Sequence, residues 1–110
     1  MPKYSRNKLI LDDGTEVSFD FDIRKIILFE DLIVVLLKIP SGTIFNENVF
    51  GVSPGGEIYW QIEKLISDTD DSPHINIKRS VNGLDAFNWS GVKVGVDLGT
   101  GKLTHRRVTK

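Results

Sequence analysis

Cysteine is absent from the 110 residues of the chain, which excludes disulfide bonds and thiolate zinc sites. Its absence also favours a reducing compartment, so we expect a cytoplasmic protein. No apolar run at the start of the chain is long enough for a signal peptide. The most apolar segment, residues 26–39, is interrupted by Glu30 and Asp31 and is too short to span a bilayer.

An excess of charge of either sign is also missing, since 14 Lys and Arg oppose 15 Asp and Glu. A net charge of −1 offers no general attraction to nucleic acid or anionic lipid, so we expect neither as a direct partner. The chain has room for one domain, which would bury about two-thirds of the surface of its unfolded state.

Recognisable catalytic and metal-binding motifs are also missing from the sequence. His74 and His105 are the only histidines, and neither has a nucleophile or a second metal ligand at a useful spacing. The aspartates of "SDTDDSP", residues 67–73, lack the central glycine and terminal glutamate of a calcium loop. We therefore expect no enzymatic activity, no metal and no cofactor.

What the sequence does contain is alternation between tight turns. "EVSFDF" alternates polar and apolar residues after Asp13-Gly14, and Asn82-Gly83 is a strong two-residue hairpin turn. Residues 24–39 are rich in β-branched side chains and break at Glu30-Asp31. We predict strands at 24–29 and 32–39, the second buried on both faces, with one long helix as the competing interpretation.

Continued through the chain, this pattern predicts an all-β protein with an antiparallel meander of about eight to ten strands. We expect two blade-like sheets, at about 8–39 and 48–108, packed as a β-sandwich, with a polar loop at 67–73. Residues 61–68 suit either a strand or a short helix.

Three turns can be superimposed, because "LDDGTEV", "VSPGGEI" and "VDLGTGKL" each place a glycine turn between aliphatic residues. The third lies in "GVDLGTG", which resembles the first phosphate loop of the actin, sugar-kinase and heat-shock ATPase superfamily. In that family the loop lies near the start of a much larger two-lobed domain, whereas here it lies close to the C-terminus. We therefore predict a hairpin in place of a nucleotide site.

Two of these segments, "NVFGVSPGGEIYWQI" and "GVKVGVDLGTGKL", resemble the repeats of quinoprotein-type β-propellers. In those repeats an aliphatic-Asp pair precedes a "TG" turn, and the next strand often carries a tryptophan. Trp60 matches that tryptophan, whereas Thr104 or His105 occupies the position in the last hairpin. The resemblance implies blade-like sheets in a partial propeller, without a closed ring or a quinone cofactor.

Small, cysteine-free domains without catalytic residues resemble the immunity proteins of bacterial toxin–immunity systems, including contact-dependent growth inhibition. The resemblance implies a non-catalytic module that binds a cognate toxin domain and covers its active site. Clustered acidic residues would suit a basic nuclease toxin, although they would also suit a solvated loop. The candidate contact residues are Glu63, Asp68, Asp70 and Asp71, with Glu47, Asn82, Asp85 and Asn88 expected in turns on the same face.

The alternative function is a small-ligand-binding or enzyme-accessory protein with a pocket at the end of the sandwich. Phe45, Tyr59, Phe87 and Trp89 are the aromatic residues that could line it. Trp60 and Trp89 are also predicted to be core residues, because both lie in alternating segments beside apolar neighbours.

Overall fold

The computed structural model describes residues 1–67, 69–81 and 83–108, which form eleven antiparallel strands and no helix. The first sheet contains β1 (Lys3–Ser5), β2 (Lys8–Ile10) and β3 (Glu16–Ser18). The central sheet contains β4 (Ile23–Phe29), β5 (Leu32–Leu37), β6 (Val49–Val52) and β7 (Ile58–Gln61). The last sheet contains β8 (His74–Ser80), β9 (Gly83–Asn88), β10 (Val92–Val96) and β11 (Leu103–Val108).

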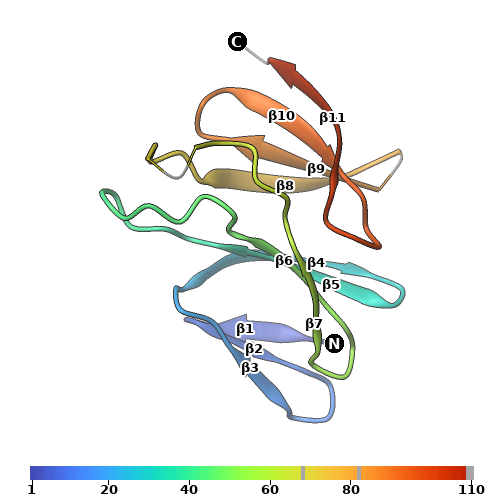
Figure 1. The fold of residues 1–110 in the computed structure, drawn as a ribbon. Coiled ribbons are helices and arrows are strands. Elements are labelled where there is room, and N and C mark those ends of the chain that lie inside the picture. The colour runs from blue at the N-terminus through green and yellow to red at the C-terminus, as the bar shows by residue number, and fades with distance from the viewer. Residues whose placement is uncertain (68, 82, 109–110) are drawn as a thin grey trace.

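The three sheets stack as layers, with the central sheet between the other two (Figure 1). Within each sheet, strands that follow one another in sequence pair side by side. The predicted all-β, antiparallel, sandwich-like fold is therefore confirmed. Across the described ranges, no helix has the length and hydropathy needed to cross a membrane.

The predicted grouping into two sheets, at 8–39 and 48–108, is wrong. After β5 the chain runs through residues 38–48 and returns to pair β6 with β5, placing Val34 opposite Gly51. Residues 49–61 therefore complete the central sheet, and only the strands from His74 onward form the last one. Of residues 61–68, which suited a strand or a short helix, Gln61 ends β7, residues 62–67 form neither, and Asp68 lies outside the described residues.

The hairpin of β4 and β5 explains why the sheets stack on both sides. Every residue of β5 is buried, as the nearly continuous apolar run predicted. Because side chains alternate along a strand, Ile33, Val35 and Leu37 face the first sheet, whereas Leu32, Val34 and Leu36 face the last. The turn at Glu30-Asp31 separates the two strands, so the competing long helix is excluded.

Two hydrophobic cores hold the layers together. The core between the first and central sheets contains Leu9, Leu11, Phe19, Ile23, Ile33, Val35, Leu37 and Val52. The core between the central and last sheets contains Ile27, Leu32, Val34, Leu36, Val49, Trp60, Ile62, Ile77, Leu84, Ala86, Val94 and Val96. Each layer therefore depends on its neighbour for burial of its apolar face.

Side chains also cross between layers to cap backbone carbonyls at strand edges. The Tyr4 hydroxyl donates to the carbonyl of Arg24 at 2.9 Å, and Lys25 Nζ donates to the carbonyl of Ile77 at 2.6 Å. The Arg79 guanidinium donates to the carbonyl of Leu28. These contacts occupy edge acceptors that another strand would otherwise use, and they tie adjacent sheets together.

All three superimposable turns form hairpin turns, as predicted, although the hydrogen bond that closes the first begins one position earlier in the superposition than in the other two. In the first two, the backbone N–H of Leu11 donates to the carbonyl of Thr15, and that of Ser53 donates to the carbonyl of Glu57, both at 2.8 Å. The third is one residue longer, so the N–H of Asp97 donates to the carbonyl of Lys102 at 2.8 Å. "GVDLGTG" therefore forms a hairpin turn, in which Asp97 Oδ1 accepts hydrogen bonds from nearby backbone N–H groups.

Candidate functional site

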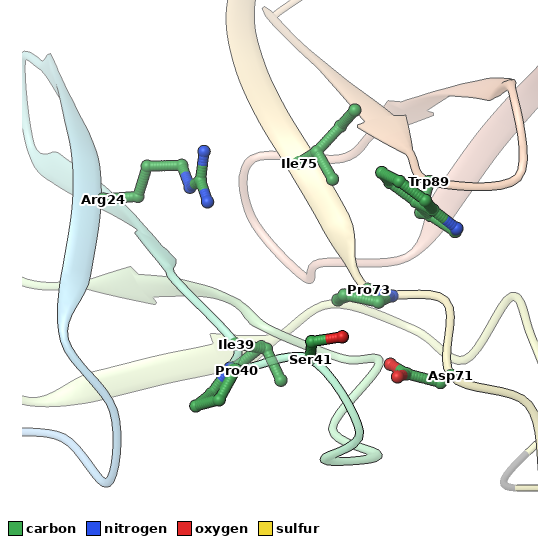
Figure 2. Close-up of a pocket in the computed structure, with 8 residues that line it drawn as sticks. All are labelled: Arg24, Ile39, Pro40, Ser41, Asp71, Pro73, Ile75 and Trp89. Carbon is green, nitrogen blue, oxygen red and sulfur yellow. The ribbon is translucent and has the colours of Figure 1, made fainter.

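A groove opens between the central and last sheets, beside the entrance to β8 (Figure 2). Its volume is about 270 Å³. Arg24 on β4 and Ile75 on β8 stand on opposite walls. The residues that line it are Arg24, Ile39, Pro40, Ser41, Asp71, Pro73, Ile75 and Trp89.

Two hydrogen bonds fix the loops that form the floor and rim of this groove. Asp71 Oδ2 accepts a hydrogen bond from the backbone N–H of Gly42 at 3.0 Å, which links the segments that follow β5 and precede β8. The backbone N–H of Trp89 donates to the carbonyl of Pro73 at 3.0 Å. This bond fixes the backbone of Trp89 beside Pro73, and the indole lies at the mouth of the groove.

Next to the groove-lining residues Pro73 and Ile75, a buried amide joins the central sheet to the last one. Asn48 is fully buried, and its Nδ2 donates to the carbonyls of Leu37 and His74, both at 2.8 Å. Its Oδ1 accepts from the backbone N–H of His74 at 2.9 Å. One side chain thus satisfies three backbone groups that would otherwise be buried without partners.

A second set of buried polar groups holds the loop before β8. Asn88 accepts a 2.6 Å hydrogen bond from the Ser72 hydroxyl and donates through Nδ2 to the Ser72 carbonyl at 2.9 Å. Asn46 Oδ1 accepts from the backbone N–H of Ser72 at 2.9 Å, while its Nδ2 donates to the carbonyl of Asp70 at 2.7 Å. These hydrogen bonds fix the backbone of Asp70 and Ser72, and so they form a rigid polar base for the neighbouring Asp71 and Pro73.

The imidazole of His74 lies within this polar base. Burial lowers the pKa of His74 from 6.5 to about 4, because the charged imidazolium would lose its hydration there. The side chain is 3% exposed, so it is closed to substrate and neutral at physiological pH. Over the described ranges, no cluster of three or more His, Asp or Glu side chains could hold a metal ion.

The surface of the groove combines exposed apolar side chains with charges of both signs. Trp89 is 69% exposed and Ile75 is 41% exposed, so two large apolar side chains face solvent beside one another. Arg24 and Asp71 supply opposite charges at the rim. Exposed tryptophan and arginine next to apolar walls are the residue types that dominate binding energy at protein interfaces.

The acidic residues expected to form one cluster are tied to different parts of the fold. Asp71 lines the groove, and Asp70 is exposed beside it. Glu63 instead faces the hairpin of β10 and β11, where its Oε1 accepts a hydrogen bond from the backbone N–H of Leu103 at 2.9 Å. Asp68 lies outside the described residues.

The second expected set is not a group of turn residues on one face. Asn88 is a buried residue of β9 that bonds Ser72, and Asp85 lies within the same strand. The expectation that both lie in turns is wrong, because β9 runs from Gly83 to Asn88 and includes both residues. Glu47 precedes β6, where its carbonyl accepts a hydrogen bond from Gln61 Nε2, and Asn82 lies outside the described residues.

The four aromatic residues expected at a ligand pocket also lie apart. Phe45 packs against Phe21 in the core between the first and central sheets, and Tyr59 lines a separate hollow beside Leu98. Phe87 contacts Lys78 on β8, and only Trp89 reaches the groove. The predicted core position of Trp89 is wrong, because β9 ends at Asn88 and the indole projects beyond it.

Most of the groove was missed by sequence reasoning, because its walls come from segments far apart in the chain. One signal for Trp89 was available in the alternation of β9. Leu84, Ala86 and Asn88 are buried, so the odd-numbered positions 85, 87 and 89 belong to the other side of the strand. Nothing comparable marks Arg24 or Pro40.

The sequence matches a family model described as "Domain of unknown function (DUF7957)" over residues 1–108. No curated protein and no solved structure matches the chain. Since the family description states no activity, the groove provides the basis for a functional argument.

Proposed function

The chain belongs to the DUF7957 family, and we propose that it is a non-catalytic protein-binding module whose contact surface is the groove around Trp89. The observation that carries the proposal is the exposure of Trp89 and Ile75 above a rigid polar base. Exposed apolar side chains gathered at a cleft are typical of interaction sites, because their burial by a partner is favourable.

The exposed walls of the groove favour a protein partner over a small ligand. Its volume of about 270 Å³ is close to the lower end of the range of about 300–1,000 Å³ that is typical of small-molecule pockets. Trp89 stands out from its wall and does not close over it. A groove of this kind suits one or two side chains of a partner whose remaining contacts lie on the surrounding surface.

The opposite charges at the rim of the groove would orient a bound partner. Arg24 and Asp71 project from opposite sides of the groove, so a partner segment with a basic group near Asp71 and an acidic group near Arg24 would be oriented by both. Asp71 is already held by Gly42 N–H, which fixes its carboxylate before binding. Such preorganisation reduces the entropy lost on association.

A cognate toxin domain in the cytoplasm is the partner class implied by the resemblance to immunity proteins. In this form of the proposal, the groove and the adjacent acidic residues Asp70 and Asp71 would cover the active site of a basic nuclease. Electrostatic complementarity of that kind speeds association and selects the partner.

Site-specific photocrosslinking tests the contact surface directly. A benzoylphenylalanine residue placed at Trp89 should crosslink one protein in cells, whereas the same residue at Tyr59 is the matched control. Tyr59 is 59% exposed and aromatic but lines a different hollow. The protein captured through position 89 should then bind the purified chain, and Trp89→Ala should weaken binding by about 2 kcal/mol or more.

A crosslink at position 59 that equals the one at position 89 would contradict the proposed surface. The toxin form is tested separately, by expressing the captured protein alone and together with the chain. Growth arrest that the chain relieves, and Trp89→Ala relieves less well, would support immunity. A captured protein that binds at the groove but arrests nothing would leave protein binding standing and reject immunity.

A further inference from the structure

The outer face of the last sheet carries a cluster of cations that the protein-binding groove does not use. Leu84, Ala86, Val94 and Val96 face the core, so the alternate residues of β9 and β10 point away from the central sheet. We define this outer face by six side chains: Lys78, Asp85, Phe87, Lys93, His105 and Arg107.

The strand register brings like charges together on this outer face. Lys93 lies directly opposite Arg107 on β11 and directly opposite Phe87 on β9. Two cations at directly opposed positions destabilise a sheet unless an anion lies between them. The one carboxylate of the six, that of Asp85, is 3.9 Å from Lys93 Nζ and lies directly opposite Lys78 on β8. One negative charge beside two of the three permanent cations leaves a net positive charge on the face.

Two flat rings accompany these cations. Phe87 lies in the middle of the sheet with Lys78 Nζ 5.5 Å from its ring centroid. The imidazole of His105 stands over Gly95, because a Cβ on that glycine would meet the ring. Cations that follow a polyanion and rings on which bases can stack are the combination used by proteins that bind single-stranded nucleic acid.

We propose that the outer face of the last sheet binds single-stranded nucleic acid, with Lys78, Lys93 and Arg107 contacting phosphates and Phe87 and His105 contacting bases. The mixture of rings and cations favours nucleic acid over an acidic protein, because carboxylates would use the cations alone. The net charge of −1 averages over the whole chain and conceals this local excess of positive charge.

Fluorescence anisotropy with a fluorescein-labelled oligothymidylate of about 20 nucleotides tests this proposal across salt concentrations. Three phosphate contacts predict a slope of log K against log salt of about −2. The double variant Lys93→Gln/Arg107→Gln should weaken binding at least about tenfold at low salt and reduce the slope to about −0.7.

Two further variants make the test specific to this face. Lys3→Gln/Lys8→Gln removes the same charge from the first sheet, at the opposite end of the stack, and should leave the affinity unchanged. Asp85→Asn removes the one carboxylate among the six side chains of the outer face and should tighten binding by about threefold. Circular dichroism of each variant checks that the fold is retained.

Three results would overturn the proposal. The first is no binding of the oligonucleotide by the unaltered chain at low salt. The second is an equal loss of affinity in the Lys3/Lys8 variant, which would indicate unspecific attraction. The third is competition by polyglutamate as effective as that by unlabelled oligonucleotide, which would assign the face to an acidic protein.

Discussion

The indole of Trp60 on β7 packs against Gly101, in the turn between β10 and β11. Trp60 Nε1 donates a 2.7 Å hydrogen bond to the carbonyl of Leu98 in the same turn. A Cβ on Gly101 would lie 2.7 Å from Trp60 Cε3, and the φ of Gly101 is +77°, a conformation that favours glycine. This contact joins the central sheet to the last sheet by packing and by hydrogen bonding at once.

Gly101→Ala should therefore lower the free energy of unfolding by about 2–4 kcal/mol, because the new methyl group meets the indole and the backbone is strained. Gly55→Ala is the matched control, since only Ser53 Oγ, at 3.8 Å, lies near its added Cβ. Urea unfolding of both variants measures the difference. Equal stability of the two variants would contradict the contact.

The two tryptophans should respond in opposite ways to truncation. Trp60 is 6% exposed and belongs to the core between the central and last sheets, so Trp60→Ala should cost about 3–5 kcal/mol of stability. Trp89→Ala should change the free energy of unfolding by less than about 0.5 kcal/mol, because its side chain is mostly in solvent. A large loss of stability in Trp89→Ala would show that this residue serves the fold.

Asn48→Ala should be among the most destabilising polar substitutions in the chain. It leaves the carbonyls of Leu37 and His74 and the N–H of His74 buried without that partner, at a cost of about 3 kcal/mol or more. Asn7→Ala is the comparison, because the Asn7 amide makes one partly buried bond to the Phe19 carbonyl and should cost about 1 kcal/mol. Thermal denaturation of both variants would reveal the difference.

Stability should fall in mild acid because of His74. Its pKa is about 4 in the folded chain and 6.5 once the chain unfolds and the imidazole is hydrated, so the unfolded chain binds the proton first. The full contribution is present above pH 6.5 and is lost progressively as the pH falls to about 4, by up to about 3 kcal/mol.

Urea unfolding between about pH 7.5 and pH 4 measures this dependence. His74→Gln should flatten the part of the curve between pH 6.5 and 4, although it also lowers stability at neutral pH. His105→Gln is the control, since it replaces the other histidine of the chain, which is exposed. If the free energy of unfolding of His74→Gln still falls steeply between pH 6.5 and 4, the acid sensitivity comes from other groups.

The local features of the fold were accessible from the sequence because they depend on near neighbours. Alternation around Asp13-Gly14 and the run from Leu32 to Leu37 predict hairpins and a strand that is buried on both faces. The glycines and the Asp or Ser residues between aliphatic neighbours predict all three hairpin turns, although the first turn closes one position earlier than the superposition places it.

The grouping of strands and the groove were not accessible, because both depend on contacts between distant segments. Nothing local shows that residues 38–48 return the chain to the edge of β5, which places Gly51 beside Val34. The groove unites Arg24 with Trp89, which are brought together only when the central and last sheets stack. The acidic residues were grouped by sequence proximity, and the fold separates Glu63 from Asp71.

Hydrogen–deuterium exchange of the chain with the protein captured through position 89 tests the groove as the contact surface most directly. Binding there should slow exchange in residues 39–42, 71–75 and 89–91, which supply or flank its walls. The turn at 54–58 should exchange at an unchanged rate. Protection confined to that turn or to the first sheet, with the groove segments unchanged, would contradict the proposed function.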